Sequence, residues 1–236
     1  MATSQSHEYQ MDIAQRILYE DNHYLAICKQ VGELVQGDET GDTPLLETVR
    51  SFIKRRDSKP GNVFLQAVHR LDRPVSGVVL FAKTSKGLTR ANGLFRQQAV
   101  TRTYWAIVEQ QPPELQGVLE GYLTRRQGPN KSYVSPRQRG DAKLARLEYR
   151  LVGESQRYYF LEISLLTGRH HQIRAQLASV GCTIRGDLKY GAKRSIPGGG
   201  IGLHARALAF EHPIAHNEVN IVAPPPDDAL WRLFPR

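Results

Sequence analysis

The sequence is poor in cysteine: its 236 residues include only Cys28 and Cys182, which lie far apart. This scarcity excludes a disulfide-stapled scaffold and a zinc site built on thiolates, and a reducing compartment fits best. Long apolar runs are also missing, because the longest, such as residues 78–82, have the length of a strand, whereas a membrane span needs about 20 residues. The first residues lack the basic and apolar segments of a secretory signal. We therefore expect a cytoplasmic protein with no membrane partner.

Basic charge is plentiful and unevenly distributed. The 32 Lys and Arg against 23 Asp and Glu give a net charge of +9. Residues 1–60 hold 7 basic and 10 acidic side chains (−3), which leaves 25 basic and 13 acidic (+12) for residues 61–236. With 40% hydrophobic and 23% charged residues, the composition is that of a folded globular chain. The later part of the chain is where a polyanion would bind.

Short strands outnumber helices in the expected secondary structure. Alternating or apolar runs bounded by turn residues predict strands at residues 17–19, 24–27, 77–84, 103–109, 118–123, 145–152, 158–166, 203–210 and 218–222. Four helices are expected. The first has an N-cap offered by Asp42-Thr43-Pro44, with Pro44 at the first helical position, and runs to Lys54-Arg55-Arg56; the second is capped by Ser85; the third runs through Ile173 and Leu177 to a stop at Gly181; and the last is at the C-terminus. Because strands often follow one another directly, we expect an α+β fold whose central sheet, largely antiparallel or mixed, is flanked by helices and loops.

One domain accounts for almost the whole chain. Residues 1–13 are expected to be a flexible N-terminal segment, and residues 14–236 a single domain that behaves as a monomer. Residues 122–143 stand apart, because six basic side chains face the single acid Asp141: Arg125, Arg126, Lys131, Arg137, Arg139 and Lys143. Gly128-Pro129 and Ser135-Pro136 interrupt regular structure there. We expect an inserted basic hairpin or mobile loop.

A dense charged motif, His69-Arg70-Leu71-Asp72-Arg73-Pro74-Val75-Ser76-Gly77, precedes one apolar strand. An Asp flanked by Arg stays ionised, because positive charge favours the carboxylate, and such a group suits a nucleophile or an electrostatic stabiliser. The alternative is that Asp72 only forms an Asx-turn before Pro74.

A second cluster, Thr167-Gly168-Arg169-His170-His171-Gln172-Ile173-Arg174, stands at an expected helix start. Free backbone N–H groups at a helix N-terminus, with Arg169 and Arg174 nearby, favour an anion. That anion could be a phosphate or Asp72. The alternatives are a solvated helix face for Arg174 and ordinary polar capping for the histidines.

The histidines do not suggest a metal centre. Adjacent His170 and His171 would point about 100° apart on a helix, and no His-Glu-x-x-His pattern occurs among the eight histidines. We expect no metal, and we expect packing or RNA contact for these side chains.

Tyr104 lies on an expected strand where it shares a face with Ala106 and Val108, while Trp105 and Ile107 take the other face. Its ring could be a core residue with a bonded hydroxyl, or a platform that stacks on a base and offers its phenol to a proton.

Together these motifs resemble the RluA-type pseudouridine synthases. The resemblance is carried by the Asp72 motif with Ser76-Gly77, then Tyr104, then Gly168-Arg169 with His171-Gln172-Ile173-Arg174. It continues in Gly186-Asp187, Lys189-Tyr190-Gly191 and Leu203-His204-Ala205, and covers residues 14–225. It implies the pseudouridine synthase fold, a catalytic domain, and isomerisation of uridine in ribosomal or transfer RNA to pseudouridine without cofactor.

The resemblance also implies roles for individual residues. Asp72 is then the essential aspartate, which attacks C1′, adds to C6 of the uracil, or promotes a glycal intermediate. Tyr104 stacks on the target uracil and is the candidate base for removing a proton, and Arg174 pairs with Asp72. Arg70 takes the place of the extruded nucleotide, which offsets a few kcal/mol of unstacking, and Ile173 forms a pocket wall. Further RNA contacts are expected from residues in and around these motifs and the basic segment: His69, Arg73, Arg169, Arg125, Arg126, Arg137 and Arg139.

The chain departs from the family pattern at two positions and in its domain content. Val75 stands where family members often have Thr, and Lys29-Gln30 where they have Lys-Pro. We expect no N-terminal RNA-binding domain of the S4 type. Two other functions remain open, an RNA-binding or ribosome-assembly protein that lost turnover, and a metal-dependent nuclease. The nuclease would need a carboxylate cluster for magnesium, and none is evident near Asp72.

Overall fold

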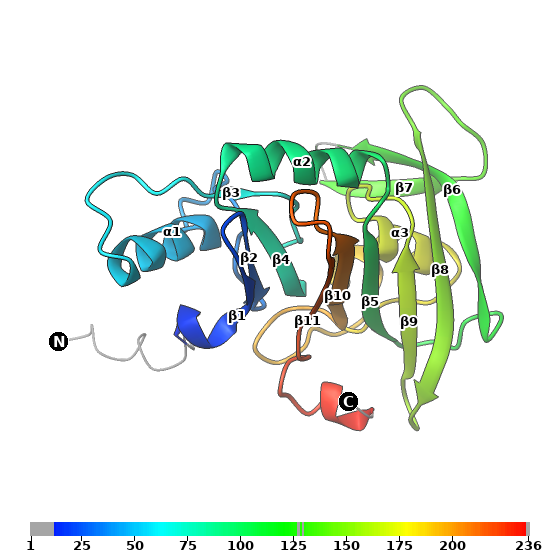
Figure 1. The fold of residues 1–236 in the computed structure, drawn as a ribbon. Helices are drawn as coiled ribbons and strands as arrows, with labels where there is room; N and C mark the ends of the chain where they lie inside the picture. The colour runs from blue at the N-terminus through cyan, green and yellow to red at the C-terminus, as the bar shows by residue number, and fades with distance from the viewer. Residues whose placement is uncertain (1–11, 127, 129, 235–236) are drawn as a thin grey trace.

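The fold is built on one large mixed sheet, seen in a computed structural model that describes residues 12–126, 128 and 130–234 (Figure 1). The described residues form an 11-stranded sheet in the order β1-β2-β4-β10-β5-β9-β8-β6-β7, with β3 paired to β4 and β11 to β10. β4 and β10 run parallel, and the other pairs are antiparallel. The α+β class with a largely antiparallel, mixed sheet is confirmed.

The strands lie close to their predicted positions. Their bounds are β1 Ile17–Glu20, β2 Tyr24–Lys29, β3 Gln66–Ala67, β4 Ser76–Ala82, β5 Thr101–Val108, β6 Gln116–Arg126, β7 Lys131–Ser135, β8 Lys143–Glu154, β9 Tyr159–Leu165, β10 Leu203–Glu211 and β11 Glu218–Val222. The sequence did not predict β3 or β7 as separate strands.

The helices are α1 (Leu45–Arg56), α2 (Ser85–Arg96) and α3 (Gln172–Ser179), with 3₁₀ turns at Ile13–Arg16, Leu188–Tyr190 and Trp231–Leu233. Two predicted caps are wrong by one residue. Pro44 is itself the N-cap of α1, and no side chain caps this helix; the carbonyls of Leu34 and Val35 accept from the first free N–H groups instead. Thr84, not Ser85, caps α2, with its hydroxyl accepting from Gly87 N at 3.0 Å.

The sheet has a hydrophobic core on each face. Along β4, Val79 and Phe81 pack into one core with α1 and α3, while Val78 and Leu80 pack into the other with α2. This alternation follows from the two-residue period of a strand, and it makes β4 buried along its whole length. β4 is therefore a rigid support for the loop that precedes it.

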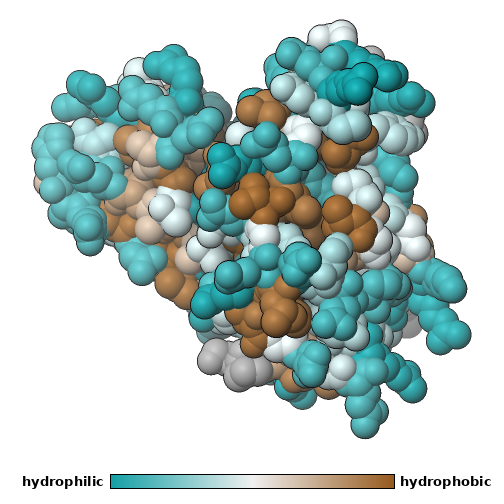
Figure 2. Space-filling model, turned by 90° about the vertical axis from the view of Figure 1, so that its right-hand side faces the viewer, coloured by the Kyte–Doolittle hydropathy of each residue, from teal (hydrophilic) through white to brown (hydrophobic). Residues whose placement is uncertain are grey.

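The expectations for the two special segments have different outcomes. Ile13, placed in the flexible segment, is buried in the core and begins a 3₁₀ turn, and residues 1–11 lie outside the described part of the chain. Residues 122–126 pair with residues 131–135 as the hairpin of β6 and β7. Figure 2 looks onto this end of the molecule, where hydrophilic residues surround hydrophobic ones and the surface is hollowed between two lobes.

No helix among the described residues is long and apolar enough to cross a membrane.

Candidate active site

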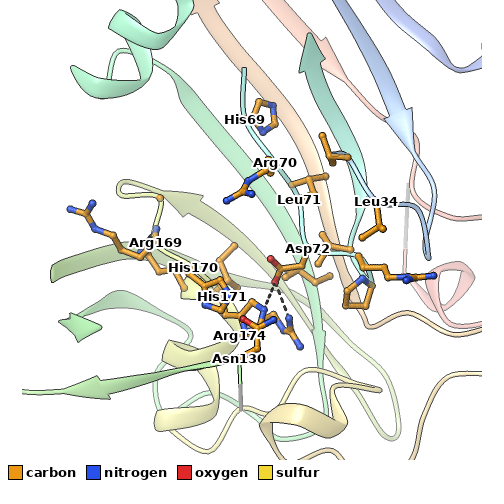
Figure 3. Close-up of a pocket in the computed structure, with 18 of the residues that line it drawn as sticks. Leu34, His69, Arg70, Leu71, Asp72, Asn130, Arg169, His170, His171 and Arg174 are labelled. Atoms are coloured by element: carbon orange, nitrogen blue, oxygen red, sulfur yellow. Dashed lines mark hydrogen bonds and ion pairs between the residues drawn. The ribbon is translucent and has the colours of Figure 1, made fainter. Parts of the chain in front are cut away.

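Three segments far apart in the chain meet at one cleft of about 900 Å³. The loop between β3 and β4 contributes Asp72 and the start of α3 contributes Arg174 (Figure 3), and β5 contributes Tyr104. The cleft is strongly basic, because its lining includes two acids, Asp38 and Asp72, and seven cations: Arg70, Arg73, Arg102, Arg125, Arg169, Arg174 and Lys189. An anionic ligand suits this charge balance.

The Asp72 carboxylate is held through only one of its two oxygens. Arg174 Nη1 donates to Asp72 Oδ2 at 2.8 Å, and His171 Nε2 lies 3.4 Å from the same Oδ2. Oδ1 accepts no hydrogen bond from the part of the chain that is described, and the side chain is 28% exposed to the cleft. The Asx-turn alternative is wrong, since the Asp72 carbonyl and not its side chain accepts from Val75 N. A fixed carboxylate therefore presents one free oxygen to a ligand.

Arg174 is a buried cation between two carboxylates. Its Nε and Nη2 donate to Asp187 Oδ2 and Oδ1 at 2.7 and 2.9 Å, and Asp187 is buried. Burial acts to lower the pKa of Arg174, but the hydrogen bonds and charges of Asp187 and Asp72 outweigh burial and raise it above its ordinary value. The solvated-face alternative for Arg174 is therefore wrong. Asp187 fixes the guanidinium, so that Nη1 points at Asp72.

His171 is held in one orientation from the side opposite Asp72. Its Nδ1 lies 3.0 Å from the hydroxyl of Tyr190, which accepts from Ser132 N at 2.8 Å in β7. Burial is the main cause that lowers the pKa of His171 to about 3, so the ring is neutral at neutral pH. Because the Asp72 oxygen that faces Nε2 can only accept, the neutral ring carries its proton on Nε2, and Nδ1 is then the acceptor toward the Tyr190 hydroxyl. His171 thus turns a neutral N–H toward Asp72, beside the charged donor Arg174.

The backbone of the Asp72 loop is fixed at every carbonyl from residue 72 to residue 75. Backbone N–H groups donate to three of these carbonyls: Val75 N to Asp72 O, Gly32 N to Arg73 O, and Ile201 N to Pro74 O. The Lys29 ammonium donates to Arg73 O and to Val75 O. Lys29 is buried without a carboxylate partner at ion-pair distance among the described residues. Burial lowers the pKa of Lys29 to about 8. Its ammonium also donates to Gln30 O at 3.0 Å, a carbonyl that either Gln or Pro can supply.

Two contacts anchor the loop to β10. Gly77 has φ +117°, and a Cβ there would lie 2.2 Å from Ala205 O, so only glycine permits the parallel pairing of β4 with β10. Ser76 Oγ lies 2.9 Å from His204 Nδ1, and His204 Nε2 lies 3.2 Å from Ala223 O. Ser76 and Gly77 therefore both serve to attach the Asp72 loop to β10.

Tyr104 lies in the cleft on the face of β5 that the alternation predicted. Ala106, Val108 and Tyr104 pack with one core, while Trp105 and Ile107 pack with another. Burial, opposed by Arg102 and supported by Asp72, raises the pKa of Tyr104 to about 12. The resting side chain is therefore the neutral phenol.

The remaining predicted site residues divide into those that line the cleft and those that do not. Arg70, Arg73, Arg169, Ile173 and Arg125 line it. His69 also lines it, but the ring is stacked on Phe95 with centroids 5.3 Å apart and accepts from Leu80 N at 3.2 Å. Three residues of the basic segment 122–143, called the β6–β7 region below, are not part of the lining: Arg126, Arg137 and Arg139.

Comparison with known proteins decides the family. The family model for RNA pseudouridylate synthase matches residues 23–179. The chain belongs to the RNA pseudouridine synthase family. It is 30% identical over 94% of its length to ribosomal large subunit pseudouridine synthase D of Zymomonas mobilis, and covers 73% of that protein. It is 32% identical over 94% of its length to ribosomal large subunit pseudouridine synthase C of Escherichia coli O157:H7, and covers 70% of it.

Solved structures of pseudouridine synthase domains share the fold. Human RNA pseudouridylate synthase domain containing 4 superposes with a TM-score of 0.76 at 24% identity, covering 91% of this chain and 90% of the other. Human RNA pseudouridylate synthase domain containing 1 gives a TM-score of 0.71 at 21% identity, covering 89% and 83%. The pseudouridine synthase fold is confirmed, and the chain is an isomerase that acts on RNA.

Several residues of this pseudouridine synthase site were not predicted as site residues. Arg102 could have been found, because it lies two residues before Tyr104 and so shares its strand face. Lys29, Asp187 and Tyr190 were noted only within motifs of the resemblance, and no spacing pointed to their partners. His171 was named only within a motif, with polar capping, packing or RNA contact as its expected roles. Among the described residues, no group of three or more His, Cys, Asp or Glu side chains is placed to hold a metal.

Proposed function

We propose that this pseudouridine synthase isomerises one or more uridines of ribosomal RNA, with Asp72 as the essential residue. The observation that carries the proposal is the free Oδ1 of Asp72 inside a basic cleft, with Oδ2 held by Arg174. An ionised carboxylate fixed in this way suits attack on an electron-poor carbon. The names of the relatives, which are ribosomal large subunit synthases, support ribosomal over transfer RNA. A ribosomal substrate also agrees with the cytoplasmic location expected from the sequence.

The reaction breaks the N1–C1′ bond of uridine and forms a C5–C1′ bond, so C5 loses a proton and N1 regains one. No electron is exchanged, and no cofactor is required. In the proposed reaction Asp72 Oδ1 acts at C1′ or at C6, or assists formation of a glycal. In each case Arg174 stabilises the carboxylate when it is regenerated, by leaving carbon in the first two routes and by giving up a proton in the third.

Tyr104 has two proposed roles that use different parts of its side chain. Its ring forms the platform on which the uracil stacks, which requires no ionisation. Its hydroxyl gives its proton to N1, and the phenolate so formed accepts the C5 proton, which restores the phenol. Burial makes this phenolate a strong base, because it raises the pKa of Tyr104 to about 12. Ile173, buried in the cleft wall, limits the space beside the base.

Access to C1′ and C5 requires that the uridine leave its stack. Arg70 is exposed on the loop directly before Asp72 (Figure 3), and we assign it to the gap that the extruded nucleotide leaves. The basic side chains of the β6–β7 region, with Arg73 and Arg169, contact phosphates around the site. The domain binds this RNA as a monomer.

Nucleoside analysis tests the substrate assignment. Transcripts of large-subunit ribosomal RNA and of transfer RNA are incubated with the protein, digested to nucleosides and analysed for pseudouridine, and reacted positions are then mapped. We expect pseudouridine in the ribosomal transcript at a few positions. Pseudouridine in transfer RNA alone would contradict the choice of substrate, and RNA binding without any pseudouridine would favour the inactive binding protein.

A further inference from the structure

Arg102 is the one half-buried cation of the cleft lining that has no carboxylate partner among the described residues. Arg174 is paired with Asp72 and Asp187, and Arg73 with Asp42. Arg70, Arg125, Arg169 and Lys189 are exposed to water, which solvates their charge. Even a half-buried cation without an anion is costly, so the Arg102 position needs a functional reason.

The surroundings of Arg102 fix its guanidinium without neutralising it. Nη2 donates to Leu166 O at 3.2 Å, the guanidinium lies 6.0 Å from the centre of the Phe95 ring, and Nε is buried without a hydrogen-bond partner in the described structure. Burial lowers the pKa of Arg102, which is the sign of a charge that lacks compensation.

The chain also leaves space for this side chain. A Cβ added to Gly168 would lie 2.6 Å from Arg102 Nη1. The φ of Gly168 is not in the left-handed region, so its backbone does not require glycine. The absence of a side chain at position 168 instead leaves room for the guanidinium in the cleft lining.

We propose that Arg102 binds a backbone phosphate next to the target uridine, and so sets the position of the ribose over Asp72. This inference rests on the proposed function and names a specific contact within it. Arg102 and Tyr104 lie two residues apart on one face of β5 and both line the cleft. A nucleotide whose base stacks on Tyr104 therefore has its phosphate within reach of Arg102. A guanidinium matches a phosphate as a hydrogen-bonding and ionic partner.

The first test uses turnover of transcribed large-subunit ribosomal RNA by wild type, Arg102→Lys, Arg102→Met and Gly168→Ala. Arg157→Met is the matched control, because Arg157 is exposed in the β8–β9 turn and is not part of the cleft lining. We expect Arg102→Met to raise KM about tenfold or more. The slope of log(kcat/KM) against log[salt] should become less steep by about 1. Arg102→Lys should show a smaller rise in KM than Arg102→Met. Gly168→Ala should raise KM as Arg102→Met does, because its methyl group displaces the guanidinium. Arg157→Met should change neither quantity.

The second test does not depend on turnover and uses uridine, uridine 5′-monophosphate and uridine 3′-monophosphate as probes, with binding followed by NMR. One monophosphate should bind wild type about tenfold or more tightly than uridine does, because it adds one charge-assisted contact, and Arg102→Met should remove this difference. The position of the preferred phosphate shows which side of the uridine Arg102 contacts.

The outcomes separate this inference from the proposed function. If wild type makes no pseudouridine but Arg102 still distinguishes a monophosphate from uridine, the substrate assignment fails and the phosphate site stands. If Arg102→Met leaves KM, the salt slope and monophosphate binding unchanged in a protein that turns over RNA, the phosphate site is wrong. If Arg102→Lys and Arg102→Met both lose turnover, and both losses are explained by a lower melting temperature, Arg102 has a packing role. That result would also overturn the inference.

Discussion

Arg174 and Asp72 are joined by a single hydrogen bond of 2.8 Å between Nη1 and Oδ2, although 101 residues separate them in the chain. The other two nitrogens of the guanidinium are occupied by Asp187. Arg174 therefore approaches Asp72 in one orientation only, and the arrangement leaves Oδ1 toward the cleft. Preorganised charge of this kind is what a site needs to stabilise a carboxylate that reacts and is released again.

Asp187→Asn tests whether the orientation of Arg174 matters for turnover. The variant leaves Arg174 buried with a weaker partner, and breaking a buried ion pair costs about 3 kcal/mol of the free energy of unfolding. Misplacement of the guanidinium should lower kcat by about 100-fold. Denaturant unfolding and steady-state kinetics measure the two effects. A stable variant with wild-type kcat would show that Asp72 does not need a clamped Arg174.

Tyr104→Phe separates the two roles proposed for the tyrosine. The ring remains as a platform, so RNA affinity should stay within about threefold, since stacking and not the hydroxyl supplies the binding. Loss of the hydroxyl should reduce turnover by about 100-fold or more, the usual contribution of a general base. Filter binding and nucleoside analysis report these quantities. Unchanged turnover would remove the hydroxyl from the reaction.

The β6–β7 region supplies a prediction about salt. Replacing Arg125, Arg126, Arg137 and Arg139 by Gln should weaken RNA binding and reduce the slope of log K against log[salt] by about 3, if each contacts one phosphate. Replacement of four exposed cations elsewhere, Lys54, Arg55, Arg157 and Arg232, is the control. Equal effects from both sets would mean that the region contributes only net charge.

His204 supplies a prediction about pH. Burial, opposed by a hydrogen bond to Ala223, lowers its pKa from 6.5 to about 4, so the unfolded chain takes up a proton first as pH falls. The stabilisation from neutral His204 is complete above pH 6.5 and is lost as pH falls toward 4, by about 1.4 kcal/mol per pH unit. His204→Gln should reduce this slope, whereas exposed His216→Gln should not. Equal slopes for wild type and His204→Gln would contradict the buried, neutral ring.

The comparison of sequence and structure shows which features a linear pattern can carry. Asp72, Tyr104 and Arg174 could be predicted to meet in one site because each lies in a motif of the family resemblance, whereas the local patterns alone left alternatives open for all three. Strand alternation placed Tyr104 on the correct face. The Asp187 clamp and the Lys29 ammonium could not, because their function depends on partners that only folding brings together. The hairpin of residues 122–135 could be predicted only as one alternative, since charge and breaker residues do not distinguish a hairpin from a loop. Cap positions differed by one residue, because backbone carbonyls from another loop replaced the expected side-chain cap of α1.

The central claim is that Asp72 carries the isomerisation of uridine, and release of tritium from RNA labelled at C5 of uridine tests it most directly. Wild type, Asp72→Asn and Asp72→Ala are compared on the same ribosomal transcript, with folding checked by thermal unfolding and RNA binding measured in parallel. We predict tritium release by wild type and none by either variant, while both variants still fold and bind RNA. Release by Asp72→Asn at the wild-type rate, or no release by wild type from ribosomal and transfer RNA alike, would contradict the account.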